Sequence, residues 1–259
     1  MKIVVCVKQV PDSAAKVVAE GGQAAWGDAP LVINPWDEYA VEAALSQQEA
    51  HGGEVIALSI GGEGAKEALK HALAMGCSEA ILISDASLVW ADTQVTSLVL
   101  ATAIQKIGGV DLACLGRQAI DSDTGLTAAQ TARRLGWPAL TLVAVIANSD
   151  PTAHTIRVER SMEEGRQVVE SRLPAVISVV KDYGEPRYPS FMGIRKASRA
   201  VIPTWSLADL GLQPLTSAVS TPEMHNPPQR EVTTEMITGS SPAEIAGILA
   251  DKILAEKVL

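Results

Sequence analysis

The sequence predicts an α/β fold: a doubly wound, mainly parallel sheet with an antiparallel extension and a C-terminal arm. The first 135 residues alternate short apolar runs with longer segments of helical period, the pattern of βαβ units. Runs such as Val55 to Leu58 are apolar throughout, which is typical of strands covered on both faces. Beyond about residue 137 the strands become separated by turn residues, which favours antiparallel pairing.

The parallel strands are expected at residues 2–7, 54–60, 80–84 and 111–115. Helices are expected at 36–50, 64–75, 93–107 and 124–135, where apolar residues recur at spacings of three and four. Because parallel crossovers are right-handed, these units should wind around both faces of the sheet and leave a ligand crevice at the carboxyl ends of the strands.

The antiparallel extension is expected to comprise residues 140–146, 154–160, 167–173 and 175–180. Residues 184–203 mix Pro, Gly and basic residues and predict a projecting loop. Residues 212–239 lack periodicity, and a terminal helix is expected over 242–258. An irregular arm is costly to order alone, so we expect it to lie along another chain. We therefore divide the chain into a nucleotide-binding domain (1–183), a recognition loop (184–203) and an arm (204–259).

The composition and charge of the chain argue against several functional classes. Of the 259 residues, 47% are apolar and 20% charged, which is sufficient for a large core. A net charge of −9 and the lack of basic runs argue against nucleic acid. The three cysteines lie in apolar stretches without metal-ligand spacing, and no secretory signal or long apolar span stands out. We expect a cytoplasmic protein that does not span a membrane.

The strongest candidate site is a polar segment that follows the strand at 111–115 and precedes a helix. A phosphate is well received at such a place, because backbone amides and the helix dipole point toward it. Thr124 and Thr127 can donate hydroxyl hydrogen bonds, whereas Asp121 and Asp123 suit helix capping or ribose hydroxyls. The alternative is a polar loop with a good N-cap. The segment consists of Gly116, Arg117, Gln118, Ala119, Ile120, Asp121, Ser122, Asp123, Thr124, Gly125, Leu126 and Thr127.

Two further junctions before helices add polar groups. Asn34, followed by Pro35, Trp36 and Asp37, can bind a base edge or cap the next helix, and capping is favoured. Asp92, Thr93 and Thr96 are also explained by capping. All three junctions should share one edge of the sheet, where together they outline a nucleotide crevice.

No residue pattern indicates catalysis or a metal site, since the four histidines are dispersed and lack a paired nucleophile. A different surface is suggested by Phe191, which lies with other apolar residues among Pro, Gly and basic residues. Such a surface suits docking to an acidic partner with an apolar pocket, although packing onto its own domain is equally open. The docking residues are expected to be Tyr188, Phe191, Met192, Ile194 and Lys196.

Several segments in register resemble the beta subunits of electron-transfer flavoproteins, including the nitrogen-fixation type and electron-bifurcating relatives. The similarity spans nearly the whole chain and includes residues 4–12, 33–35, 72–76, 116–121, 172–176 and 186–188. It implies a nucleotide site at Cys6, Asn34 to Asp37, Ile60 and Gly116 to Thr127. It also implies a recognition loop from Tyr188 to Lys196, with Phe191 in place of a leucine-like anchor.

The resemblance implies a heterodimer whose alpha subunit carries most of the FAD contacts and is embraced by the arm. The complex would carry electrons from flavin-dependent dehydrogenases to a quinone reductase or another acceptor. The nucleotide in this chain would be AMP or, in bifurcating relatives that oxidise NADH, a second FAD. Asp92-Thr93 with Thr96 and Asp123-Thr124 match the bifurcating group, whereas Gly125-Leu126-Thr127 departs from it. A nucleotide-binding regulator without redox activity is the alternative from another class.

Overall fold

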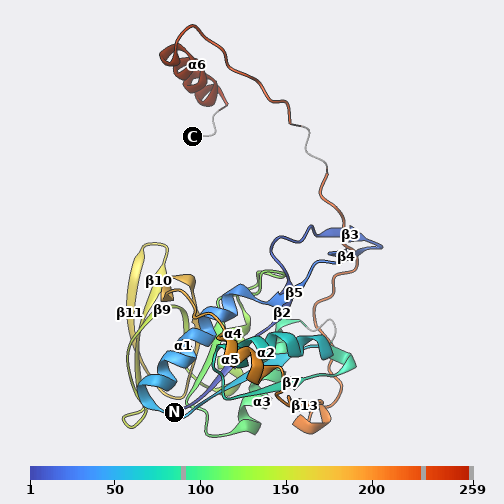
Figure 1. Cartoon of the computed structure of the whole chain (residues 1–259), viewed down its shortest axis with the longest axis vertical. Helices are drawn as coiled ribbons and strands as arrows, with labels where there is room; N and C mark the ends of the chain where they lie inside the picture. The colour runs from blue at the N-terminus through green and yellow to red at the C-terminus, as the bar shows by residue number, and fades with distance from the viewer. Residues whose placement is uncertain (89–91, 229–231, 257–259) are drawn as a thin grey trace. The chain divides into compact units, whose positions relative to one another are not determined.

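The computed structural model describes residues 1–88, 92–228 and 232–256. Its largest sheet has nine strands and is flanked by helices (Figure 1). The strand order is β11-β10-β9-β12-β8-β1-β6-β7-β13. The parallel strands of its first part are β1 (Lys2–Cys6), β6 (Glu54–Ile60), β7 (Glu79–Ile83) and β8 (Leu112–Gly116). All four lie within a residue or two of their expected positions.

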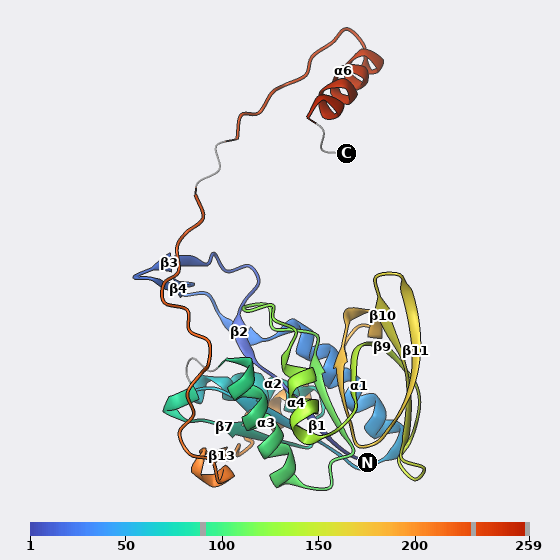
Figure 2. The same cartoon turned by 180° about the vertical axis from the view of Figure 1, so that it is seen from behind.

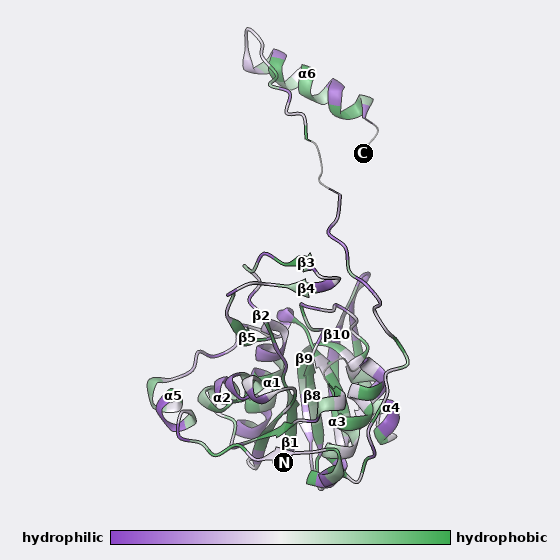
Figure 3. Ribbon diagram, turned by 90° about the vertical axis from the view of Figure 1, so that its right-hand side faces the viewer, coloured by the Kyte–Doolittle hydropathy of each residue, from purple (hydrophilic) through white to green (hydrophobic). Residues whose placement is uncertain are grey.

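Helices cover both faces of this sheet, as Figures 1 and 2 show from opposite sides. Helices α1 (Pro35–His51) and α2 (Lys66–Met75) contribute to one apolar core, and α3 (Thr93–Ile107) and α4 (Thr127–Leu135) contribute to the other. Along β1, Ile3 and Val5 face the first core whereas Val4 and Cys6 face the second. The central strands are therefore hydrophobic along their length (Figure 3), which explains the unbroken apolar runs.

The sheet reverses its winding direction at β1. Strands β6 and β7 follow on one side of β1, and β8 lies on its other side. In an open parallel sheet, the connections that follow the two strands at such a point lead to opposite faces and leave a crevice outside the carboxyl ends. Here those ends are Cys6 of β1 and Gly116 of β8, both in the predicted site.

The antiparallel extension contains β9 (Ala139–Asp150), β10 (Thr155–Met162) and β11 (Gly165–Arg172). The assignment of residues 175–180 to this extension was wrong, because β12 (Ala175–Val179) runs parallel to both β8 and β9. All five residues of β12 are buried, so this strand has two covered faces and belongs with the central parallel strands.

Two smaller expectations also need correction. The predicted loop at 184–203 contains a helix, α5 (Phe191–Ala197), which is capped by Ser190 and packs beside α2. Helix α4 begins at Thr127 rather than 124, since Asp123 and Gly125 have φ values of 50° and 62° that no helix accommodates. The 3₁₀ turn η1 (Glu63–Ala65) forms the start of the helix expected over 64–75, and β5 (Leu31–Ile33) is the strand of the expected junction before α1. Short elements that lack a periodic signal were missed: β2 (Gln9–Pro11), β3 (Val18–Glu20), β4 (Gln23–Ala25), β13 (Thr204–Trp205) and the 3₁₀ turns η2 (Ala86–Leu88), η3 (Lys181–Tyr183) and η4 (Ala208–Leu210).

The chain forms two compact units, Met1–Met224 and His225–Leu259. Residues 204–224, at the start of the expected arm, belong to the first unit, where β13 pairs with β7. The second unit contains α6 (Pro242–Ala255), capped by Ser241, while the end of the helix predicted to reach 258 lies outside the described residues. No helix in the described ranges is both long and apolar enough to cross a bilayer.

Candidate functional site

Asn34 joins the first two predicted junctions. Its side-chain oxygen accepts a hydrogen bond from the backbone N–H of Ile120 (3.1 Å), and its amide nitrogen donates to the carbonyl of Gln118 (2.8 Å). The side chain is 1% exposed and does not cap α1, so the expectation of capping was wrong. Asn34 instead fixes the loop after β8 against the start of α1.

Asp37 lies in the same cluster and is also buried. Its carboxylate accepts a hydrogen bond from the backbone N–H of Lys8 (2.8 Å). Burial raises the pKa of Asp37 to about 7, against the opposing effect of hydrogen bonds from Asn34, Lys8 and Gly116. Near neutral pH the Asp37 carboxyl group is therefore partly protonated.

Gly116 is required by this packing. A Cβ atom at this position would lie 2.7 Å from the carbonyl oxygen of Trp36 and closer still to the Asp37 carboxylate. Only glycine allows β8 to end in contact with the first turn of α1. The thiol of Cys6 lies at the end of the adjacent strand, where burial and then the charge of Asp37 raise its pKa and keep it neutral.

The loop after Gly116 is largely exposed, and polar contacts hold its conformation. Lys8 pairs with Asp121 (2.7 Å), and the Gln118 side-chain amide donates to Asp123 (2.7 Å). The guanidinium of Arg117 stacks over the ring of Trp36 at 5.5 Å. Both aspartates are thus used within the loop, and Lys8 neutralises one of the negative charges that would otherwise repel a phosphate.

Helix α4 starts without a side-chain cap in the described part of the chain, where Leu126 occupies the N-cap position. Of the two roles expected for Asp121 and Asp123, helix capping is therefore wrong, and a contact with ribose hydroxyls stays a prediction. Uncapped first-turn amides attract an acceptor from outside the chain. Thr127 opens this first turn, and Thr124 lies exposed just before it.

The third junction lies at the same edge of the sheet but has other hydrogen-bond partners. Asp92 caps α3 as expected, accepting from Val95 N–H (2.8 Å). Its second carboxylate oxygen accepts from the backbone N–H groups of Ala218 (2.7 Å) and Val219 (3.1 Å), and these bonds lower its pKa together with the cap. Thr93 and Thr96 lie in the first turn, and Ile60 ends β6 nearby in the strand order. Asp92 thus holds residues 217–219 to α3.

Lys8 is the residue that the sequence prediction left out of the site. It lies two residues after the end of β1, so its place at the carboxyl edge was available from the strand assignment. Its partner Asp121 is 113 residues away, and that separation carries no local signal.

The predicted docking residues lie together around α5. Tyr188 and Phe191 are 92% and 80% exposed, and Met192, Ile194 and Lys196 are also exposed. Ser190 caps the helix by accepting from Gly193 N–H (2.9 Å), and Ala197 is buried against the domain. We name Tyr188, Phe191, Met192, Ile194 and Lys196 the docking surface.

Comparison with known proteins agrees with this architecture. The model of the electron transfer flavoprotein domain matches residues 27–210. The CarD subunit of the caffeyl-CoA reductase–Etf complex of Acetobacterium woodii is 39% identical, and the electron transfer flavoprotein subunit beta of Megasphaera elsdenii is 34% identical, each over the full length of both chains. Protein FixA of Azorhizobium caulinodans is 40% identical, over 82% of this chain and 78% of FixA. The chain therefore belongs to the electron-transfer flavoprotein family, among the beta subunits and their FixA and CarD relatives.

Proposed function

We propose that this chain holds an adenine nucleotide at the carboxyl edge of its sheet and carries electrons only in complex with a flavin-bearing alpha subunit. The main support is the uncapped N-terminus of α4 beside the buried cluster of Asn34, Asp37 and Gly116. The loop 117–126 and the α4 amides would receive the phosphate, with hydroxyls from Thr124 and Thr127.

Both AMP and the adenosine half of FAD fit this chemistry. AMP would make the subunit a scaffold, with the redox-active FAD on the alpha partner. Support for AMP comes from Asp92, whose carboxylate already binds the backbone of residues 218 and 219. Flavin chemistry would come from the cofactor, while protein groups position it and tune its potential.

A second candidate is an electron-bifurcating complex in which this chain binds its own FAD and accepts hydride from NADH. The full-length similarity to CarD, a subunit of a reductase–Etf complex, favours it. Thr93 and Thr96 at the same sheet edge would then be added to the nucleotide site.

The experiment is to count the nucleotides released by denaturing the purified complex. One FAD and one AMP support the electron carrier, whereas two FAD support bifurcation. A nucleotide without any flavin would instead support the regulator from another class. We further propose that the complex works in the cytoplasm and docks flavin-dependent dehydrogenases through the docking surface, passing electrons to a quinone reductase or a similar acceptor.

A further inference from the structure

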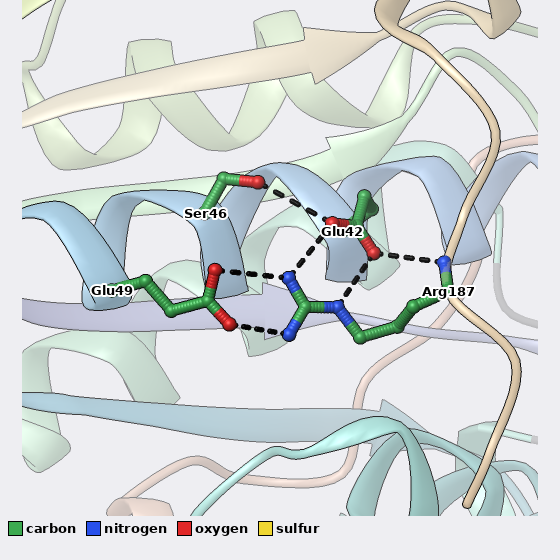
Figure 4. Close-up of polar contacts among 4 residues, drawn as sticks. All are labelled: Glu42, Ser46, Glu49 and Arg187. Atoms are coloured by element: carbon green, nitrogen blue, oxygen red, sulfur yellow. Dashed lines mark hydrogen bonds and ion pairs between the residues drawn. The ribbon is translucent and has the colours of Figure 1, made fainter.

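A double ion pair fixes the segment that leads into the docking surface (Figure 4). The guanidinium of Arg187 donates to Glu42 from Nε (2.9 Å) and Nη2 (2.8 Å), and the backbone N–H of Arg187 donates to the same carboxylate (2.9 Å). Nη2 also donates to Glu49 (3.2 Å), and Nη1 donates to the other oxygen of that carboxylate. One arginine thus binds two carboxylates at once.

Both carboxylates come from α1 and are spaced by two helical turns, so they lie on the same face of the helix. The Glu42 side chain is only 15% exposed, and Ser46 donates a further hydrogen bond to it (3.4 Å). Arg187 lowers the pKa of Glu42 and of Glu49, and the two carboxylates in turn raise the pKa of Arg187. All three groups therefore stay charged at neutral pH.

The chain between this ion pair and the docking surface is short and stiff. Pro186 and Pro189 flank Arg187 and Tyr188, and each proline fixes its own φ angle. Ser190 then caps α5, and the close approach of Gly193 to the carbonyl group of Ala74 seats α5 on α2. The segment is held at two points, on α1 through Arg187 and on α2 through Gly193.

We propose that Arg187 is a positioning residue for docking. Its ion pairs with Glu42 and Glu49 set the direction in which Tyr188 and Phe191 are presented to a partner protein. This inference rests on the docking role in the proposed function. Exposed aromatic side chains bind well only when their orientation is fixed beforehand, because ordering them on binding costs entropy.

The test compares two variants. Arg187→Lys keeps the positive charge but loses the planar guanidinium group that binds both carboxylates, and Glu49→Gln removes the charge of the more exposed of the two carboxylates. Arg157→Lys is the matched control, because Arg157 pairs with Glu170 (3.6 Å) on β10 and β11, away from α5. Each variant is purified as the full complex with its flavin-bearing subunit. Hydrogen exchange of the amides from Ser190 to Ala197 is measured together with flavin content and steady-state transfer from a flavin-dependent dehydrogenase that reduces the wild-type complex.

We expect Arg187→Lys to speed exchange of these amides and to raise the KM for the dehydrogenase by about three- to tenfold, the loss expected when a forked pair becomes a single contact. Glu49→Gln should act in the same direction but less, while kcat, flavin content and the control stay at wild-type values. If Arg187→Lys has the same KM as wild type while Phe191→Ala raises the KM, the positioning role of Arg187 is refuted and the docking role of the surface is retained. If Phe191→Ala also leaves KM unchanged, the docking surface itself is wrong and the inference fails with it.

Discussion

The proposed nucleotide site and the docking surface hold their side chains in place by opposite means. In the first, polar side chains are buried: Asn34 and Asp37 are 1% and 6% exposed, and backbone N–H groups of the loop after β8 and of Lys8 donate hydrogen bonds to them. In the second, apolar side chains such as Phe191 remain exposed, and the polar contacts lie behind them at Arg187 and Ser190. A ligand site thus depends on burial, whereas a docking site depends on how its backbone is anchored.

This difference predicts that changes in the nucleotide site alter stability and ligand content, whereas changes in the docking surface alter only transfer to a partner. The largest expected effect concerns Asp37. Its folded-state pKa is about 7 against an ordinary value of 3.8, so the native state holds the proton more tightly than the unfolded chain. The stabilisation from that proton is complete below the ordinary value and is lost as pH rises through 7.

We expect the free energy of unfolding of the wild type to fall by roughly 1–4 kcal/mol between pH 4 and pH 7 because of Asp37. Asp37→Asn should lack this part of the fall, since asparagine cannot ionise. Denaturant unfolding at several pH values measures it. Parallel pH profiles for the two proteins would contradict the raised pKa.

Gly116→Ala places a Cβ against Trp36 and Asp37 and should lower the free energy of unfolding by about 1–3 kcal/mol, the range for overpacking a tight site. We also expect the purified complex to lose its nucleotide. Gly62→Ala is the control, because a Cβ there meets no atom within 4 Å and its φ is −73°. Full nucleotide content in Gly116→Ala would show that the close approach does not shape the site.

Phe191→Ala should leave unfolding and flavin content unchanged and raise the KM for the dehydrogenase by about tenfold, as for a central aromatic contact. Val168→Ala, which trims an exposed apolar side chain of β11, is the control. Transfer kinetics equal to wild type would remove Phe191 from the docking surface.

The smallest effect is expected for Asp92→Asn. Asparagine offers one acceptor oxygen where the carboxylate has two, so the α3 cap and the contact with residues 218 and 219 compete, at a cost of about 1 kcal/mol. Exchange of the Ala218 and Val219 amides should accelerate. Unaltered protection of both amides would mean that Asp92 does not hold this segment.

The sequence was sufficient for features that depend on local pattern. The unbroken apolar run of β6, the spacing of α3 and the capping side chain of Asp92 each predict their element from a few adjacent residues. The same local information placed the loop 116–127 between a buried strand and a helix, and so identified the main part of the candidate site.

By itself, then, the sequence determined the fold class and which segments reach the carboxyl edge of the sheet. The reason is that the periodicity of strands and helices depends on residues that are close together in the sequence. Only the tertiary structure decided that Asn34 binds residues 84 and 86 positions away, that Arg187 binds a glutamate 145 positions away, and that β12 is parallel. The physical reason is that a polar side chain takes whichever partner the packed chain brings within reach, and local sequence does not specify that partner.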